Sequence, residues 1–156
     1  MAFESISMFS ERRFASLLKA SVLADIAPDS VPVLYSLMEC GAAQPGDCIR
    51  ANDDLNATLF IVASGGVQFF DPAQHRQLAR LHLGDSFGML SMLFPGIACP
   101  DAYAIEPTQC VMLHCEALRM LELSDPKLAI AISRCIRSHL TPLMSVVSNV
   151  VMRHCL

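Results

Sequence analysis

The sequence predicts a mainly β fold with flanking helices: an antiparallel β-roll, or double-stranded β-helix of the jelly-roll type, with N-terminal helices and a long C-terminal helix. The first observation is a series of short apolar runs between residues 44 and 114, separated by turns rich in Gly, Pro and Asp. This spacing is typical of a sandwich or barrel and not of a parallel sheet. The second observation is that apolar residues on both sides of this region recur at helical spacing.

Length and composition fit one compact domain. The chain has 156 residues, of which 53% are hydrophobic, and a formal net charge of −4. We therefore expect residues 1–156 to form a single domain with a buried core. No Lys/Arg cluster supplies the phosphate neutralisation on which nucleic-acid binding depends. No apolar run reaches the roughly 18 residues of a membrane span, and the N-terminus lacks a signal-peptide pattern.

The seven cysteines are scattered and never form a C-x-x-C pair. This favours buried thiols in a reducing compartment, and we expect a cytoplasmic protein. Cys110 and His114 lie four residues apart on a predicted strand, about 13 Å by strand rise, too far to share one metal ion. His75 and His82 stand alone, without the His-x-His pair of a cupin metal site. We expect no metal and no cofactor.

The N-terminal helices are predicted within residues 8–40. Ser10 is placed to cap a helix in which Phe14, Leu17 and Leu18 recur at helical spacing. A second helix, 31–38, follows a Pro-Asp-Ser turn and carries a proline in its first turn, where proline is tolerated.

The β-roll is predicted over residues 44–114, after the apolar period changes from helical spacing to two. Turns at 45–47, 52–54, 64–66, 71–72 and 106–108 delimit its strands. The predicted strands are 48–50, 57–62, 67–70, 75–83, 101–105 and 109–113.

The stretch LHLGDSFGMLSML, residues 81–93, interrupts the strands with a predicted short helix, 88–93. The first turn of a helix has free N–H groups, and a glycine at its start lets a ligand approach the backbone. The stretch is therefore a candidate ligand site, with Gly88, Met89, Leu90 and Ser91 as its residues.

Two C-terminal helices are predicted within 115–153. The second begins at Asp125-Pro126 and runs to about residue 152, with Pro142 inside it as a possible kink. Its apolar stripe continues for about six turns, and a helix of this length outgrows a small barrel. We expect the stripe to form a homodimer seam or to contact a regulatory partner, the alternative being that it packs on the barrel. The stripe residues are Ile132, Ile136, Leu140, Leu143, Val147 and Val150.

These elements, in this order, resemble the cyclic nucleotide-binding domain, the sensor half of the catabolite activator and fumarate-nitrate regulator superfamily. The residues that carry the resemblance are those of the helices within 21–38, PGDCIRANDD (45–54), LFIVASGGVQFF (59–70), LHLGDSFGMLSML (81–93) and LELSDPKLAIAISRCIRSHL (121–140). The resemblance covers nearly the whole chain. It implies a β-roll whose segment 81–93 is the phosphate-binding cassette.

The resemblance also shows where this cassette departs from its family. In nucleotide-binding members a Glu that meets the ribose 2′-OH follows the Phe-Gly pair, and here that residue is Met89. An Arg that pairs with the cyclic phosphate follows further on, but no Arg lies between Leu81 and Thr108, and the aligned position is near Asp101, just before Ala102. Replacing attraction by repulsion costs on the order of 1–4 kcal/mol at 4 Å. We expect no tight binding of cyclic AMP or cyclic GMP.

Three possibilities for the cassette stay open. It can plug the mouth of the roll and bind nothing. It can line a pocket for a more apolar ligand, with Met89, Met92 and Cys99 in the wall. A strand residue, Arg80 or Arg50, can also replace the missing cation.

The sequence thus predicts a non-catalytic regulatory or sensor module that acts through dimerisation or partner contact. We find no Ser–His–acid signature and no Walker-type loop, and expect no enzyme. In the family the long helix leads to a DNA-binding winged helix, and here the chain stops about where that linker would begin, so we expect no direct DNA binding. The alternative is a sensor that binds a cyclic nucleotide or a more apolar small molecule.

Overall fold

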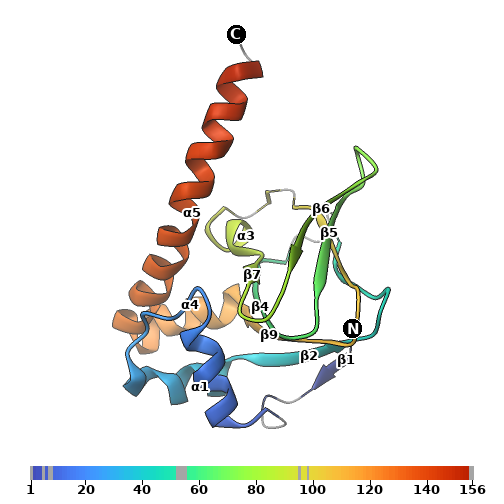
Figure 1. Ribbon diagram of the computed structural model, residues 1–156. Coiled ribbons are helices and arrows are strands. Elements are labelled where there is room, and N and C mark those ends of the chain that lie inside the picture. The colour runs from blue at the N-terminus through green and yellow to red at the C-terminus, as the bar shows by residue number, and fades with distance from the viewer. Residues whose placement is uncertain are drawn as a thin grey trace.

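Two antiparallel sheets form the β-roll in the part of the chain that the computed structural model describes (Figure 1). The described residues are 2–4, 6, 9–51, 56–94, 96–97 and 99–154, with side chains described outside 2–4 and 142–154. One sheet has the strand order β1-β2-β9-β4-β7 and the other β3-β8-β5-β6. The strands are β1 (Ala2–Glu4), β2 (Glu39–Ala43), β3 (Cys48–Arg50), β4 (Thr58–Ser64), β5 (Val67–Asp71), β6 (Arg76–Leu81), β7 (Ser86–Phe87), β8 (Asp101–Ala104) and β9 (Thr108–His114). The predicted β-roll with flanking helices is confirmed.

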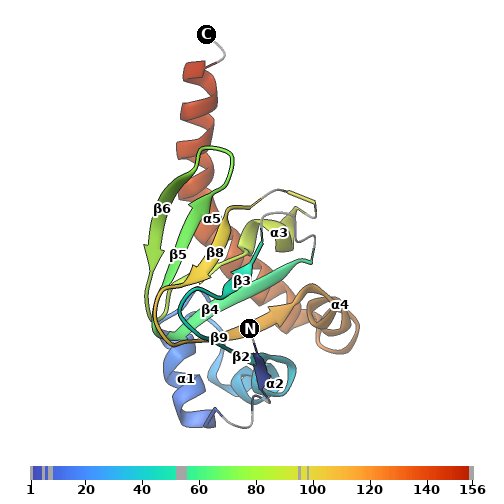
Figure 2. The same cartoon turned by 90° about the vertical axis from the view of Figure 1, so that its right-hand side faces the viewer.

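Helices lie at both ends of the chain and at the cassette. They are α1 (Glu11–Lys19), the 3₁₀ turn η2 (Pro28–Ser30), α2 (Val31–Leu37), α3 (Met89–Leu93), α4 (Cys115–Ser124) and α5 (Pro126–His154). The hydroxyl of Ser10 caps α1 by accepting a hydrogen bond from the Arg13 amide at 3.2 Å. Helix α5 begins beside α4, passes α3 and continues beyond the roll (Figures 1 and 2). It is one continuous element through Pro142.

The buried residues form two clusters on opposite faces of the five-stranded sheet. On β4, Leu59 and Ile61 belong to the cluster shared with the helices, whereas Phe60 and Val62 belong to the cluster inside the roll. Alternate residues of a strand point to opposite faces, so β4 is buried on both sides. This explains why the sequence there is a continuous apolar run and not an alternating one.

Some predicted boundaries were wrong. The second N-terminal helix was predicted over 31–38, but α2 ends at Leu37, and β2 begins at Glu39, where it pairs with β9. The strand predicted at 75–83 is shorter and ends at Leu81, because Gly84 turns the chain with a φ of +87°. Strand β7 lies inside the cassette, where we predicted no strand. The predicted turn at 52–54 lies outside the described residues.

Candidate functional site

A small cavity lies under the cassette helix α3, between the roll and α5. Its volume is about 160 Å³. We call it the cassette cavity; the residues that line it are Arg50, Phe69, Ser86, Phe87, Gly88, Met89, Leu90, Cys99, Pro100 and Leu140. Ligand pockets for drug-sized molecules occupy about 300–1,000 Å³, so this cavity is suited to a smaller molecule.

Gly88 sets the position of α3 over the roll. It is the N-cap of α3 and has a φ of +81°, a conformation that L-residues with a side chain rarely adopt. A Cβ atom at this position would collide with the carbonyl oxygen of Thr58 on β4 and lie 3.3 Å from Nη1 of Arg50. Only glycine lets the chain start a helix this close to the sheet.

Arg50, at the end of β3, is hydrogen-bonded to α3. Its side chain is buried, and Nη1 donates a hydrogen bond to Oγ of Ser91 at 3.0 Å. That hydroxyl in turn donates to the carbonyl oxygen of Gly88 at 2.7 Å. A buried guanidinium is costly unless it is hydrogen-bonded, so this chain of contacts ties the end of β3 to the cassette. Arg50 also lines the cassette cavity and gives its mostly apolar wall one positive charge.

Ser86 adds a second polar group to the cavity wall. Its Oγ is buried, and no described residue hydrogen-bonds to it. Buried hydroxyls usually have a partner, so this one is available to a ligand atom or a water molecule. The apolar walls are aromatic on one side, where the Phe87 ring meets the Phe69 ring edge-on at 5.6 Å.

The structure brings together only some of the predicted site residues. Gly88, Met89 and Leu90 line the cavity, and Ser91 lies beneath them as the partner of Arg50. Arg80 is exposed on β6 and is not among the lining residues.

The remaining two candidates, Asp101 and Ala102, belong to β8 and do not line the cavity either. Ala102 is buried inside the roll. Asp101 lies beside Tyr103, whose hydroxyl donates to Oδ2 at 3.4 Å, and the negative charge of Asp101 raises the pKa of Tyr103. Its carboxylate therefore acts on a neighbouring strand residue and not on the cassette cavity.

The first half of the α5 stripe is core and not a dimer seam. Ile132 and Ile136 are 0% exposed and Leu140 is 4% exposed in the single chain. Side chains that the domain itself covers cannot contact another subunit, so the prediction was wrong for these three. An apolar stripe has the same periodicity whether it packs on the domain's own core or on another subunit, and only the fold distinguishes the two arrangements. The side chains of Leu143, Val147 and Val150 lie outside the described residues.

Sequence reasoning missed several residues that line the cavity, among them Leu140 and Ser86. Leu140 was assigned to the stripe alone, although it also closes the cavity wall from α5. Ser86 carried no signal, because a serine next to a turn is ordinary.

Other polar clusters have structural explanations. Nδ1 of His114 shares a hydrogen bond with the hydroxyl of Thr58 at 3.0 Å, and Nε2 contacts the carboxylate of Glu39 at 3.0 Å. Thr58 is buried, so its hydroxyl is closed to a substrate, and the three residues link neighbouring strands. No group of three or more metal-ligating side chains occurs within the described ranges.

The described cysteines form no disulfide bond. Six cysteines are free thiols, and burial raises the pKa of Cys110 to about 12, so that thiol is unreactive at neutral pH.

Among the helices that the structure describes, none combines the length and the hydrophobicity needed to cross a membrane.

Comparisons with known proteins agree with the fold. The chain is 33% identical over 119 residues to the cyclic AMP receptor protein of Thermus thermophilus, a match that covers 72% of this chain and 55% of that protein. The chain thus spans about half the length of the curated relative it matches. No family model matches the chain.

Two solved structures extend the likeness. A cyclic nucleotide-binding domain from Methylobacillus flagellatus has a TM-score of 0.79 at 20% identity, covering 99% of this chain and 89% of that one. The catabolite activator protein of Thermus thermophilus has a TM-score of 0.67 at 26% identity, covering 83% of this chain and 62% of that one.

Proposed function

We propose, from the premise that this chain is a cyclic nucleotide-binding domain of the catabolite activator type, that it is a non-catalytic regulatory module acting through α5. In this proposal the cassette does not bind cyclic AMP or cyclic GMP tightly. The signal is instead carried by the helix that leaves the roll next to the cassette.

The observation that carries the proposal is the position of Leu140. It lines the cassette cavity, and it is buried, whereas Thr141 beside it is exposed. Beyond this point α5 continues to His154, past the roll (Figure 1). A change in the cavity therefore acts on α5 at the place where the helix leaves the domain.

Three features argue against an ordinary cyclic nucleotide. The cavity of about 160 Å³ is smaller than a typical ligand pocket. Met89 presents an apolar side chain where a ribose hydroxyl needs an acceptor, and an unpaired buried hydroxyl costs roughly 1–3 kcal/mol. The buried cation, Arg50, already donates to Ser91.

A second candidate function is a sensor for a small ligand that is less polar than a nucleotide. Arg50 and the Ser86 hydroxyl, to which no described residue hydrogen-bonds, favour it, because together they offer a charge and a hydrogen bond within an apolar wall. This candidate uses the same site and the same connection to α5.

The part of α5 beyond Leu140, residues 141–154, provides the test of the proposed regulatory module. We expect the chain to self-associate or bind a partner through this part, and Leu143→Glu to abolish that association, measured by sedimentation velocity. Arg137→Glu, which changes the charge of an exposed position nearer the roll, is the matched control. A wild-type chain that stays monomeric and captures no partner through α5, or a Leu143→Glu chain that associates like the wild type, would contradict the proposal.

A further inference from the structure

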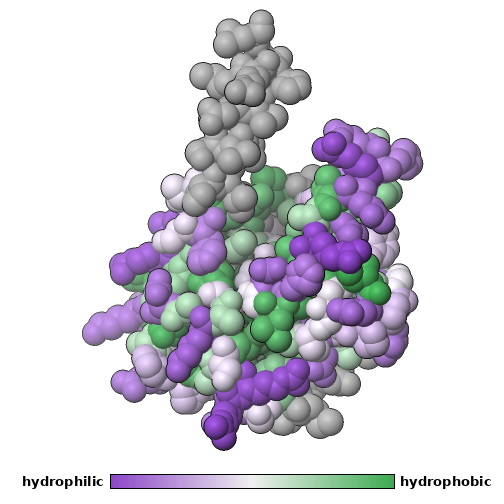
Figure 3. Space-filling model, in the orientation of Figure 1, coloured by the Kyte–Doolittle hydropathy of each residue, from purple (hydrophilic) through white to green (hydrophobic). Residues whose placement is uncertain are grey.

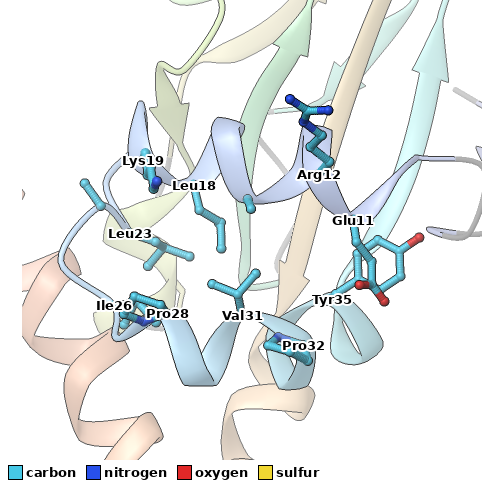
Figure 4. Close-up of a pocket in the computed structure, with 12 residues that line it drawn as sticks. Glu11, Arg12, Leu18, Lys19, Leu23, Ile26, Pro28, Val31, Pro32 and Tyr35 are labelled. Atoms are coloured by element: carbon cyan, nitrogen blue, oxygen red, sulfur yellow. The ribbon is translucent and has the colours of Figure 1, made fainter.

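A hollow lies between α1 and α2, remote from the cassette. Its volume is about 500 Å³, within the range of small-molecule pockets. We call it the α1–α2 hollow; the residues that line it include Glu11, Leu18, Lys19, Leu23, Val31 and Tyr35. Figure 4 shows Leu18 and Val31 pointing toward each other across the space between the two helices.

The residues at the floor of the hollow, Leu18 and Leu23, belong to the hydrophobic core. Leu18 is 3% exposed and Leu23 1%, so an apolar group placed there extends the buried cluster that the helices share with the sheet. The ring of Tyr35 is a fixed wall, because its hydroxyl donates to the carbonyl oxygens of Phe9 and Ile6 at 2.6 and 3.1 Å. An occupant therefore meets a preformed apolar surface, which reduces the cost of ordering on binding.

Charges at the two ends of the hollow differ. Lys19 lies at one end, and Glu11 lies at the other (Figure 4). The two positions are eight residues apart, which is about 12 Å along α1. No described carboxylate forms an ion pair with Lys19. Arg12 also lines the hollow at the Glu11 end, but its guanidinium points away from α2 (Figure 4). Within the hollow an anionic group is therefore attracted to Lys19 and repelled by Glu11, which favours one direction for an elongated ligand.

The surroundings favour a small molecule over a protein. Specific protein interfaces bury about 800 Å² on each partner. Of the large apolar side chains that are exposed in the described part of the chain, only Val33 belongs to α1 or α2. Hydrophilic and hydrophobic side chains are also intermixed on the face that carries α1 (Figure 3). The apolar surface is thus concentrated inside the hollow and does not spread around it.

We propose that the α1–α2 hollow binds a small amphiphilic anion, an aliphatic chain ending in a carboxylate. The chain lies on Leu18, Leu23 and Val31, and the carboxylate meets the ammonium group of Lys19. This site is separate from the cassette cavity and does not depend on the proposed function.

The probe is decanoate, titrated below its micelle concentration by calorimetry, with hexanoate and octanoate as shorter members. Each buried methylene is expected to raise affinity roughly three- to fourfold, because apolar area is removed from water. Lys19→Gln is expected to weaken decanoate binding roughly 1.5-fold to fivefold, the range of an exposed charge pair. Lys19→Glu is expected to weaken it further and to favour decyltrimethylammonium instead.

Arg13→Glu is the matched control. It makes the same charge change on α1, but Arg13 stacks over the Phe9 ring at 4.2 Å and does not line the hollow. Val31→Phe fills the hollow and is expected to abolish binding, with unchanged circular dichroism as evidence of folding. The absence of decanoate binding, or equal weakening by Lys19→Glu and Arg13→Glu, overturns the proposal. Binding that survives Val31→Phe in a folded chain also overturns it, since the probe then occupies another site.

Discussion

The cassette cavity and the α1–α2 hollow differ in where their cations are and in how much space they leave. The cassette cavity has a buried Arg50 engaged with Ser91 and about 160 Å³ of space. The hollow has an exposed Lys19 at its end and about 500 Å³. In the first region the cation supports the fold, and in the second it is available to a ligand. The region that resembles a known ligand site is therefore the one with less room for a ligand.

The largest effect on this contrast is expected at Gly88. Gly88→Ala should destabilise the domain by about 3 kcal/mol or more, because a Cβ atom collides with the Thr58 carbonyl oxygen at a positive φ. The measurement is denaturant unfolding. Gly46→Ala, whose φ is +90° but whose Cβ meets nothing within 4 Å, should cost only about 1–2 kcal/mol. An equal loss of unfolding free energy at the two positions would mean that the backbone at Gly88 is not in close contact with β4.

Arg50 and Arg12 compare a buried arginine of the cassette cavity with an exposed arginine at the rim of the hollow. Arg50→Ala should cost about 2–3 kcal/mol, because it removes a buried, charge-assisted hydrogen bond to Ser91 and leaves empty space. Arg12→Ala, on the exposed rim of the hollow, should change the free energy of unfolding by less than about 0.5 kcal/mol. Urea unfolding of both variants measures the difference, and similar values would remove the structural role from Arg50.

Leu140 tests the connection between the cassette cavity and α5. Leu140→Ala should destabilise by about 2 kcal/mol, at the low end for such a change, since one side of Leu140 already faces a cavity. Leu123→Ala, at a position 89% exposed, should cost less than about 0.5 kcal/mol. Thermal or urea unfolding measures both. If Leu140→Ala cost as little as Leu123→Ala, α5 would not be anchored at the cavity.

The interior of the roll should also respond to alkaline pH. Cys110 shares a buried cluster with Phe87, and burial raises the pKa of its thiol from 9.0 to about 12. The folded state therefore holds the proton more tightly, and stability is lost as the pH rises from about 9 toward 12. Between pH 7 and pH 10 this group should account for roughly 1 kcal/mol of lost unfolding free energy. Cys110→Ala should flatten the pH profile by that amount, and an unchanged profile would contradict the assignment.

The sequence predicted the architecture better than it predicted the site. Turn residues between short apolar runs were sufficient for the β-roll, and Ser10 was sufficient for the start of α1. The β2 strand was missed because its residues, ECGAA, have little strand propensity, and pairing with β9 decides their structure.

The site was harder because side-chain direction depends on tertiary contacts. Arg80 and Arg50 are both strand arginines, but β6 is largely exposed on both faces, so nothing in its pattern showed which way Arg80 points. The sequence likewise could not show what the stripe on α5 contacts, since an apolar period of three to four is the same against a core or a partner. The α1–α2 hollow had no sequence signal, because its floor residues are ordinary members of amphipathic helices.

The most direct test of the proposed regulatory module is thermal unfolding of the purified chain with and without cyclic AMP and cyclic GMP. A ligand at a hundred times its dissociation constant adds about 2.7 kcal/mol to the stability of the folded state. For a domain of this size that raises the unfolding midpoint by roughly 5–10 °C. We predict no rise at millimolar nucleotide, because the cassette cavity is small and Arg50 is engaged with Ser91. A clear rise that Arg50→Gln abolishes would contradict this account and would make the cassette a working nucleotide site.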